Sequence, residues 1–509
     1  MNIGGLLARN ARYRPEKLAL IFENQRFTYR EYNQNVNRLA NALVDMGIRK
    51  GDKVATLLVN SLELLETYWA AAKIGAVVVP LSTLLLGKGL KTLIEDSDSV
   101  AVITYSGFVQ TLEEIRPELN GIRPDRYILT DRADLTGYRS YHDLTAAASP
   151  EDPRGIEITG DDLFNIIYSS GTTGQPKGIV HTHAIRAMYC TLGACAFRIT
   201  PESVIIHTGS IVFNGAFVTL MPSLFLGATY ILHRQFEAKA FIDTVQREGA
   251  THVIMVPAQI IAILQSEHFS TPALASLEMI CNVGAPLHQG YKDELNRRLP
   301  GRLYDLYGLT EGFLTILDRR DAGAKSGSVG IPPAFYDLRI CDDQGNDVPA
   351  GTVGEIVGRG PILMPHYYKR PDLTREAIRE GWLFTGDLGY VDEEGFLYLV
   401  DRKKDMIISG GVNVYPRDIE EIIVQHPVVS EAAVFGVPSD KWGEMPVAAI
   451  TLKKTGAIAA EDLKTWINEN VSAKFQRVQE VILLDQLPRN IAGKVLKRVM
   501  REEYVATRK

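Results

Sequence analysis

The chain has 509 residues, of which 46% are hydrophobic and 23% are charged, and its formal net charge at pH 7 is −6. These values are typical of a soluble globular protein with more than one domain, and the negative balance argues against a general binder of nucleic acid or of anionic membranes. The cysteines match no zinc or redox spacing and predict reduced thiols in a cytoplasmic protein. They are Cys190, Cys195, Cys281 and Cys341. The N-terminal residues lack the long apolar core of a secretory signal.

Strand-like and helix-like segments alternate along most of the chain. Residues 54–59 predict a strand, residues 62–74 a helix and residues 76–80 another strand. The same step recurs with a strand at 251–256 and a helix at 257–265. Such alternation predicts an α/β fold with largely parallel sheets, stacked in a large N-terminal domain.

The most informative segment runs from 168 to 178 and reads YSSGTTGQPKG. It lies between two apolar strand-like runs, at 163–168 and at 179–181. Glycines let a backbone approach a ligand closely, and hydroxyls and a lysine can bind phosphate oxygens. The residues expected to do so are Ser169, Ser170, Gly171, Thr172, Thr173, Gly174 and Lys177. The proline before the lysine and the glycine after it exclude the Walker pattern, and a flexible surface loop is the alternative.

Residues 203–232 contain no Asp, Glu, Lys or Arg, so they stand out as an uncharged stretch. Asn214, Gly215, Pro222 and Gly227 interrupt the apolar residues, whereas a transmembrane helix needs about 20 predominantly apolar residues. We therefore expect a buried helix and a strand here rather than a membrane span.

The C-terminal part of the chain has a different pattern. Short strands with Gly, Asp and Pro turns at 326–368 predict a β-rich subdomain, and residues 390–400 predict a hairpin with its turn at 392–395. Five charged residues then follow one another at 401–405, which is typical of a solvated turn. We place a domain boundary there, between an N-terminal domain at 1–400 and a small, mobile α+β C-terminal domain at 401–509.

Three further motifs accompany the loop at 168–178. Residues 307–311 read YGLTE, residues 382–387 read WLFTGD and residues 488–494 read PRNIAGK. Together with DRKKDMIISGGVNVYP at 401–416, they make the chain resemble the adenylate-forming (AMP-binding) superfamily. Within it the chain looks most like bacterial fatty-acyl and aryl-CoA ligases, and the resemblance covers nearly the whole sequence.

The resemblance implies a reaction in two halves. A carboxylate attacks the α-phosphate of ATP and gives an acyl-adenylate and pyrophosphate. The thiol of coenzyme A then attacks the adenylate carbonyl and releases AMP. Both halves bring anionic partners together, so charge must be neutralised and the reactants held in line.

The resemblance also assigns roles to single residues. Lys494, Thr310 and Glu311 are the expected catalytic residues: Lys494 would bridge the acid and the α-phosphate, Thr310 would bind the α-phosphate, and Glu311 would hold Mg²⁺. Asp387 would bind the ribose hydroxyls, and Arg402 the ribose and phosphate region. The residues expected around adenine are Gly284, Ala285, Pro286, Tyr307 and Gly308. Taken singly, the charged residues also fit surface positions or turns.

The second half-reaction and the acid imply further residues. Gly410 and Gly411 would line the coenzyme A path, and Lys404 would be the hinge between the domains, with a plain linker turn as its alternative. The residues expected in the acid pocket are Phe213, Asn214, Val283 and Leu309. We see no Arg or Lys beside these segments that could pair with a second carboxylate. An acid with one carboxylate and an apolar tail or ring is therefore favoured.

Three positions depart from the pattern of the superfamily. Asn214 stands where relatives often have His, and Ala492 stands where many have Ser or Thr. Residues 473–478 read AKFQRV where relatives often have Tyr-Lys-x-Pro, so at Gln476 a basic residue is shifted or missing. The first departure makes the acid pocket the least transferable part of the resemblance.

The sequence therefore predicts an ATP-dependent, AMP-forming acid–thiol ligase. It would make an acyl-CoA from a medium- or long-chain fatty acid or an aryl acid, with ATP, Mg²⁺ and CoA. An adenylating enzyme that loads a separate carrier protein and a non-catalytic nucleotide-binding homologue are the alternatives. We expect no nucleic-acid partner and no integral membrane segment, and we leave peripheral membrane contact and a homodimer open.

Overall fold

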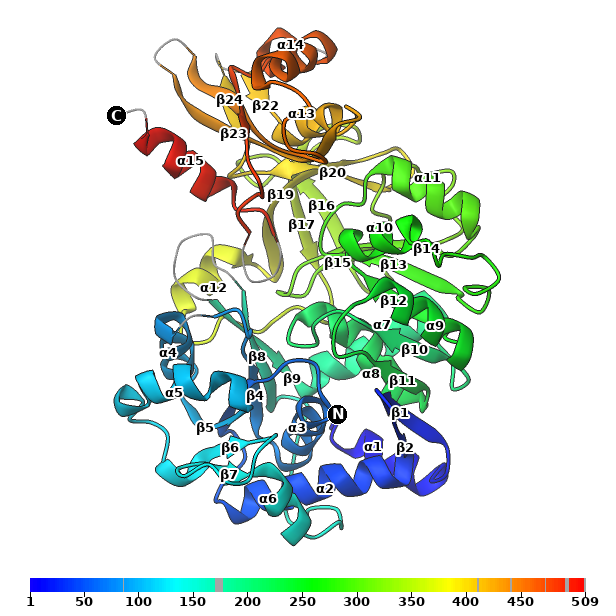
Figure 1. Cartoon of the computed structure of the whole chain (residues 1–509), viewed down its shortest axis with the longest axis vertical. Helices are drawn as coiled ribbons and strands as arrows, with labels where there is room; N and C mark the ends of the chain where they lie inside the picture. Colours follow the sequence, from blue (N-terminus) through cyan, green and yellow to red (C-terminus); the bar gives the residue numbers. More distant parts are fainter. Residues whose placement is uncertain are drawn as a thin grey trace. The chain divides into compact units, whose positions relative to one another are not determined.

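The computed structural model describes residues 1–85, 87–169, 177–409, 412–439, 442–471, 473–489 and 494–507, without the side chain of Ser169. The chain divides into two compact units, each described here by itself (Figure 1). Unit 1 comprises Met1–Ser326, Pro332–Asp337 and Arg359–Leu383. Unit 2 comprises Gly327–Ile331, Leu338–Gly358 and Phe384–Lys509.

The first sheet of unit 1 has eight strands. They are β1 (Leu18–Phe22), β2 (Gln25–Thr28), β10 (Val204–His207), β11 (Thr229–Leu232), β12 (His252–Met255), β13 (Met279–Val283), β14 (Leu303–Gly308) and β15 (Leu314–Leu317). Their order is β15-β14-β13-β12-β10-β11-β1-β2. The pairs from β14 to β1 are parallel, and β2 and β15 join the two edges antiparallel. Strands such as β12 are buried along their whole length, as expected for a parallel sheet covered on both faces.

The second sheet of unit 1 has seven strands. They are β3 (Lys53–Leu57), β4 (Val77–Pro80), β5 (Ser99–Thr104), β6 (Tyr127–Leu129), β7 (Arg139–Ser140), β8 (Leu163–Ser169) and β9 (Lys177–Thr182). Their order is β7-β6-β5-β3-β4-β8-β9, and only the last pair is antiparallel. The predicted phosphate loop thus connects two neighbouring antiparallel strands.

Four helices form a layer that contacts both sheets. They are α2 (Tyr29–Asp45), α3 (Leu62–Ile74), α7 (His183–Phe197) and α8 (Phe217–Leu226). α2 and α8 pack on strands of the first sheet, and α3 and α7 on strands of the second. Local sequence sets their ends: Thr28 and Glu31 form a capping box before α2, and Gly75 ends α3 at a φ of 70°.

Other helices cover the outer faces of the two sheets. α9 (Ala238–Glu248), α10 (Pro257–Gln265) and α11 (Gln289–Arg298) share a hydrophobic core with the first sheet, and α4 (Gly87–Asp96) and α5 (Val109–Ile115) with the second. Unit 1 also contains α1 (Gly5–Tyr13), α6 (Tyr141–Ala147) and α12 (Pro371–Ala377). Its short 3-10 helices are η1 (Ser106–Phe108), η2 (Arg116–Glu118), η3 (Pro124–Arg126) and η4 (Asn214–Ala216). The layers therefore alternate helix, sheet, helix, sheet, helix.

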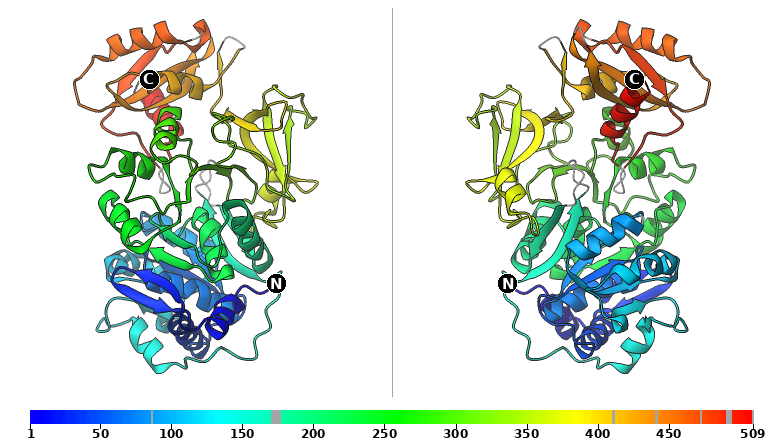
Figure 2. Two further views of the ribbon diagram at one scale, coloured as in Figure 1. Left: turned by 90° about the vertical axis from the view of Figure 1, so that its right-hand side faces the viewer. Right: turned by 90° about the vertical axis from the view of Figure 1, so that its left-hand side faces the viewer.

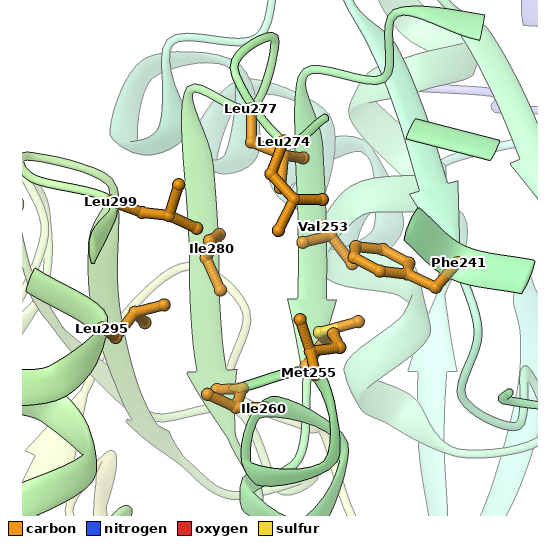
Figure 3. Close-up of a pocket in the computed structure, with 10 residues that line it drawn as sticks. Phe241, Val253, Met255, Ile260, Leu274, Leu277, Ile280, Leu295 and Leu299 are labelled. Atoms are coloured by element: carbon orange, nitrogen blue, oxygen red, sulfur yellow. The ribbon is translucent and has the colours of Figure 1, made fainter. Parts of the chain in front are cut away.

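A small cavity lies within the core between α9, α10, α11 and the strands β12 and β13 (Figure 3). Phe241, Met255, Ile280 and Leu295 are among the side chains that line it, and every lining residue is apolar. Because such a cavity offers no polar group to orient a nucleotide or a carboxylate, we treat it as a packing gap.

Unit 2 begins with the β-rich part of the chain. Its strands are β16 (Asp337–Cys341), β17 (Gly354–Arg359), β19 (Trp382–Val391) and β20 (Leu397–Arg402), except for the end residues Asp337, Arg359, Trp382 and Leu383, which belong to unit 1. The short β18 (Ile378–Arg379) is also in unit 1 and pairs with Trp382 and Leu383. The amide of Asp392 donates to the carbonyl of Phe396, and the amide of Gly395 donates to the carbonyl of Asp392. These bonds close the β19–β20 connection and confirm the predicted hairpin and its turn.

The rest of unit 2 is a five-stranded sheet between helices (Figure 2). Its strands are β21 (Ile407–Ser409), β22 (Val412–Val414), β23 (Val429–Ser439), β24 (Gly443–Leu452) and β25 (Glu480–Leu483). One face packs on α13 (Pro416–Ile423) and α14 (Ala460–Asn470), and the other on α15 (Lys497–Ala506); η5 (Lys474–Gln476) precedes β25. In Figure 2 these helices appear in orange and red beside the strands.

The predicted α/β class is confirmed, with a large N-terminal part of mostly parallel sheets and a small C-terminal part. The predicted helices at 62–74 and 257–265 are α3 and α10, with the same bounds. Residues 203–232 form a buried helix, α8, with a strand on each side of it rather than one strand. The division by contacts assigns residues 384–400 to unit 2; a hinge at 401–405 stays a prediction. Within the part of the chain that the structure describes, no helix combines the length and apolarity needed to cross a membrane.

Candidate active site

The residues expected around adenine come together at one edge of the first sheet. β13 and β14 are neighbouring parallel strands, with Val283 paired to Leu306. Gly284, Ala285 and Pro286 follow β13 and are exposed, while Tyr307 and Gly308 end β14. Because parallel strands end at the same edge, the two segments lie side by side there, where α/β proteins commonly bind ligands. Gly284 has a φ of 87°, a conformation that glycine adopts without strain.

A buried polar group supports this edge and was missed by the sequence analysis. The side-chain amide of Asn282 donates from Nδ2 to the carbonyl of Ala285 (3.0 Å) and to Asp305 Oδ1 (2.9 Å). Lys292 of α11 lies 2.5 Å from Asp305 Oδ2, and both side chains are less than a tenth exposed. A buried charge is tolerated when it is paired, so this ion pair holds the 283–286 turn against β14. The signal available in the sequence was a charged residue, Asp305 on β14 and Lys292 on α11, at a position where the pattern predicts an apolar one.

The turn at 309–312 contains the predicted catalytic residues Thr310 and Glu311 and is tightly held. The amide of Leu309 donates to the carbonyl of Phe313, and the amide of Gly312 donates to the carbonyl of Leu309. Gly312 has a φ of 109°, and a Cβ there would lie 2.0 Å from the carbonyl oxygen of Ile362. Only glycine fits this approach, so the backbone around Thr310 and Glu311 is fixed while both side chains stay half-buried.

A return segment at 362–368 ties this turn to β9. The amide of Met364 donates to the carbonyl of Glu311 (2.8 Å), and the amide of Tyr368 donates to the carbonyl of Gly178 (2.7 Å). On β9, His181 Nε2 lies 2.9 Å from the carbonyl oxygen of Thr310. Burial, and after it the charge of Arg186, keep the pKa of His181 well below its usual value. The ring is therefore neutral and donates to that carbonyl from Nε2.

Tyr367 connects two of the predicted site residues. Its hydroxyl donates to Glu311 Oε1 (2.8 Å), and Lys177 Nζ lies 5.2 Å from the centre of its ring. Burial and the nearby Glu311 carboxylate raise the pKa of Tyr367, so it remains a donor. The structure thus brings the lysine of the phosphate loop and the carboxylate expected to hold Mg²⁺ onto one buried tyrosine. No local sequence pattern marks Tyr367, because the contact depends on the return of 362–368 to β9.

Several predicted nucleotide residues lie outside the described residues. The predicted phosphate-binding residues concerned are Ser170, Gly171, Thr172, Thr173 and Gly174, and of Ser169 only the backbone is described, at the end of β8. Gly410 and Gly411, predicted for the coenzyme A path, are also outside, although β21 and β22 on either side are described. Their roles stay predictions.

The acid segment contains a feature that the sequence analysis missed. Phe213 and Asn214 are half-buried at the start of η4, before α8. Asn214 Oδ1 accepts a hydrogen bond of 2.8 Å from Arg186, a fully buried residue of α7. The expectation that no Arg or Lys lies beside the acid segment is therefore wrong. Arg186 precedes Asn214 by 28 positions, and only the packing of α7 on α8 brings them together. The other two acid-pocket candidates, Val283 and Leu309, flank the β13–β14 edge and are half-buried.

In unit 2, Asp387 and Arg402 face each other. They are directly paired between β19 and β20, and Arg402 Nε lies 3.3 Å from Asp387 Oδ1. The hydroxyl of Thr385 accepts from the amide of Asp387 (3.1 Å) and donates to the carbonyl of Ile356 (2.7 Å). The carboxylate is thus held on a strand, and the side chain of Arg402 beside it is about two-fifths exposed.

Lys404 and Lys494, the two lysines of unit 2 with predicted roles, are both exposed. Lys404 lies in the turn after β20, where the amide of Asp405 donates to the carbonyl of Arg402. Desolvation lowers the pKa of Lys404; the charges of Asp405 and Asp387 oppose this shift, and those of Arg402 and Lys494 add to it. The same electrostatic environment therefore includes Asp387, Arg402, Lys404 and Lys494, although their motifs are far apart in the sequence. Residues 490–493, before Lys494, are outside the described residues.

Comparison with known proteins agrees with this arrangement. The sequence matches the family model of the AMP-binding enzyme over residues 7–368, and that of the AMP-binding enzyme C-terminal domain over residues 418–494. A long-chain-fatty-acid–CoA ligase of Mycobacterium tuberculosis is 34% identical over 514 residues, with 99% of each chain covered. A feruloyl-CoA synthase of an Amycolatopsis species is 32% identical over 507 residues, again with 99% of each chain covered.

The solved structures show the same relationship. The ATP-bound MatB of Rhodopseudomonas palustris has a TM-score of 0.90 and is 31% identical, and the match covers 100% of each chain. The family models, the full-length relatives and the fold therefore agree. The chain belongs to the AMP-binding enzymes of the adenylate-forming superfamily and, within it, to the acyl- and aryl-CoA ligases, which are AMP-forming acid–thiol ligases that use ATP and CoA.

Proposed function

We propose that this enzyme converts a monocarboxylic acid, either a medium- or long-chain fatty acid or an aryl acid, into its CoA thioester through an acyl-adenylate. The observation that carries the proposal is the Tyr367 contact, which joins Lys177 of the phosphate loop to Glu311 of the catalytic turn. A cation and a carboxylate meet on Tyr367, and Thr310 is the residue directly before that carboxylate; the transfer of an adenylyl group requires such charged and polar groups close together.

In the first half-reaction, a carboxylate oxygen of the acid attacks the α-phosphorus of ATP. The bond between that phosphorus and the bridging oxygen of the β-phosphate breaks, and pyrophosphate leaves with the electron pair. We assign Lys177 to the leaving phosphates, Thr310 to the α-phosphate, and Lys494 to the charge that develops between the acid and the α-phosphate. Fixed donors in these places stabilise the transition state more than the ground state.

Mg²⁺ fits the residues present. Tyr367 donates to one oxygen of Glu311, and no described residue donates a hydrogen bond to the other oxygen. Among the described residues no group of three or more His, Cys, Asp or Glu side chains could hold a metal ion. A single carboxylate is a suitable protein ligand for Mg²⁺, which usually binds one or two carboxylates together with substrate phosphates. When bound, the ion would neutralise phosphate charge, and Glu311 would hold it.

In the second half-reaction, the sulfur of CoA attacks the carbonyl carbon of the adenylate, and AMP leaves on the oxygen of its α-phosphate. We assign the segment of Gly410 and Gly411 to the thiol path and the region of Lys404 to the movement that exchanges the two half-reactions. Asp387 and Arg402 would bind the ribose and phosphate through both steps. Hinges of this kind are residues that absorb a backbone change without disturbing a core.

The proposal predicts a specific reaction profile. Octanoate, palmitate, benzoate, cinnamate and ferulate should be compared by AMP release in the presence of ATP, Mg²⁺ and CoA. At least one should yield acyl-CoA, identified by its mass. Adenylate that accumulates without thioester would instead favour loading of a carrier protein, and the absence of pyrophosphate exchange with every acid would favour a non-catalytic homologue.

The cysteines and the proposed substrates bear on where in the cell the enzyme works. The four cysteines are free, and three of them, Cys190, Cys281 and Cys341, are buried. We propose a cytoplasmic enzyme, because ATP and CoA are its substrates and reduced thiols are usual in that compartment.

A further inference from the structure

Arg186 is a fully buried cation that forms no ion pair with a carboxylate among the described residues. Its Nη1 donates to Asn214 Oδ1 (2.8 Å), and its Nε and Nη2 donate to Asn165 Oδ1 (3.3 and 3.1 Å). Its guanidinium also lies 4.1 Å from the ring centre of Phe217 and 4.9 Å from that of Tyr189. Burial lowers the pKa of Arg186 to about 10, so it remains charged at neutral pH.

Three other cations with little exposure, all among the described residues, each have a carboxylate partner. Lys292 pairs with Asp305, and Lys497 pairs with Glu420 at 2.8 Å. Lys73, on the inner helix α3, contacts Asp152. Burying a charge without a counter-charge is costly, so the neutral surroundings of Arg186 call for a reason beyond packing.

The surroundings of Arg186 also contain buried polar atoms without a hydrogen-bond partner. Asn165 and His181 are directly paired residues of β8 and β9, so their side chains lie on the same face of the sheet. Asn165 Nδ2 and His181 Nδ1 are both buried and unpaired. Because buried polar atoms are nearly always bonded, these two mark a polar site that is incomplete in the protein alone. The site extends from Asn214 through Arg186 to His181, whose Nε2 donates to the carbonyl of Thr310.

The contacts of Asn214 define which of its atoms are available. Its Oδ1 accepts from Arg186, and its Nδ2 donates to the hydroxyl of Tyr189 (2.9 Å). One N–H of the amide is left over, and Asn214 is only half-buried. An amide whose oxygen accepts from a guanidinium is polarised, which makes its N–H a stronger donor. The side chain therefore cannot turn freely, and it presents a donor, not an acceptor.

We propose that Arg186 is a positioning residue that holds Asn214 so that its remaining amide N–H binds an oxygen of the substrate acid. The inference rests on the proposed function, because it assigns Asn214 to the acid pocket, and it adds a specificity rule to it. The preferred acid places a hydrogen-bond acceptor beside Asn214 of η4. This position is next to the charge of Arg186 of α7, which no carboxylate of the described residues neutralises. That acceptor is either the reacting carboxylate or an oxygen on the tail or ring.

The test combines four variants, Asn214→Asp, Asn214→Leu, Arg186→Lys and Arg186→Met, with the wild-type enzyme. The assay measures acyl-CoA formation from the best acid of the panel, with KM determined separately for the acid and for ATP. Asn214→Asp removes the N–H and puts a carboxylate against Arg186. We expect it to raise the KM of the acid at least about tenfold, the usual loss for a hydrogen bond to a charged group. The KM of ATP should stay within about twofold of wild type.

Stability separates this role from a purely structural one. Asn214→Asp supplies the missing counter-charge, so its Tm should equal or exceed that of wild type while acid binding is lost. Arg186→Met should also raise the KM of the acid, and Arg186→Lys should restore part of the loss because the charge remains. The matched control is Arg198→Met, because Arg198 lies just after the same helix and pairs with Asp318. It should change Tm without changing the KM of the acid.

Pairs of related acids identify which oxygen of the acid accepts the hydrogen bond from Asn214. Cinnamate and hydroxycinnamate share a skeleton and differ in one acceptor on the ring. If the Asn214 variants lose affinity for both acids equally, the N–H binds the reacting carboxylate; if only hydroxycinnamate is affected, it binds the ring oxygen. An unchanged acid KM in Asn214→Asp and Asn214→Leu, with wild-type acyl-CoA formation intact, would overturn the inference and leave the proposed function standing.

Discussion

The catalytic turn of unit 1 and the lysine of unit 2 are built in opposite ways. Thr310 and Glu311 lie in a turn fixed by backbone bonds to Phe313, by a glycine against Ile362 and by the side chain of Tyr367. Lys494 is exposed, in unit 2, which has its own sheet and hydrophobic clusters.

The difference fits a division of labour between the two units. Groups that bind the reacting phosphates must be preorganised, because reorganisation would reduce their effect on the transition state. A group needed in only one half-reaction can be carried by a separate unit and withdrawn for the other. The predictions below, ordered from the largest expected effect to the smallest, either sharpen this contrast or break it.

Replacing the exposed lysine should have the largest effect. Lys494→Ala should slow acid-dependent pyrophosphate exchange on the order of 100- to 1000-fold, the usual loss when a donor to a developing negative charge is removed. Thioester formation from a supplied acyl-adenylate and CoA should stay within about threefold of wild type, because the contrast assigns this lysine to one half-reaction only.

Arg498→Ala serves as a matched control, because Arg498 is an exposed cation of α15 whose one ion pair among the described residues is with Glu502. It should leave both half-reactions intact. Equal losses in both half-reactions of Lys494→Ala would break the contrast, because the lysine would then act throughout the reaction.

The next effect should come from the fixed turn. Glu311→Gln removes the charge expected to hold Mg²⁺, and we expect a loss of roughly 10- to 100-fold in kcat/KM, with a higher Mg²⁺ concentration needed for half-maximal activity. Tyr367→Phe removes only the hydroxyl that donates to this carboxylate, so it should cost roughly fivefold. A Mg²⁺ titration of wild type, Tyr367→Phe and Glu311→Gln measures whether the loss is larger in Glu311→Gln than in Tyr367→Phe. An unchanged titration curve in Glu311→Gln would contradict the role of Glu311 in holding Mg²⁺.

A smaller and more selective effect is expected at Asp387. Asp387→Asn keeps the shape of the side chain but loses the charge that faces Arg402. We expect the KM of ATP to rise roughly tenfold, with the KM of the acid unchanged, because an ionised carboxylate accepts ribose hydroxyl bonds better than an amide. Steady-state kinetics with each substrate varied in turn measures both values. A change in the acid KM alone would show that Asp387 does not bind the nucleotide.

A buried carboxyl of the inner helices should affect stability and not activity. Burial raises the pKa of Glu66 from 4.5 to about 7, and Tyr141 donates to it. Because the folded protein prefers the protonated form, the stability associated with Glu66 is complete below about pH 4.5 and declines as the pH rises toward 7. The shift corresponds to on the order of 3 kcal/mol.

Glu66→Gln cannot lose this proton, so its Tm relative to wild type should rise between about pH 5 and about pH 8. Thermal unfolding at both pH values measures the difference, and kcat at neutral pH should stay unchanged. A Tm difference that is the same at both pH values would show that Glu66 titrates normally in the folded state.

Much of this arrangement could be predicted from local sequence. The alternation of apolar strands with helical patterns encodes the α/β class, because strands such as β12 are buried along their length and helices such as α9 bury one face. The YGLTE motif begins at the end of β14, after the strand-like run that precedes it in the sequence, and the WLFTGD motif lies on β19. Asp387 and Arg402 pair because both are on one hairpin, whose turn the sequence marks with Asp and Gly.

The contacts that depend on tertiary packing could not be predicted. Tyr367 reaches Glu311 across 56 residues, and Arg186 reaches Asn214 because α7 packs on α8. An arginine in a largely apolar helix resembles an ordinary helix residue until its burial is known. For this reason the sequence led us to expect no Arg or Lys beside the acid segment, and that expectation was wrong.

The most direct test of the central claim is the stoichiometry of the full reaction with the best acid of the panel. Acid, ATP, Mg²⁺ and CoA should give acyl-CoA, AMP and pyrophosphate in equal amounts, measured by mass and by phosphorus spectroscopy in the same sample. ADP and phosphate as the nucleotide products, or AMP without a thioester, would contradict the account of an AMP-forming acyl-CoA ligase.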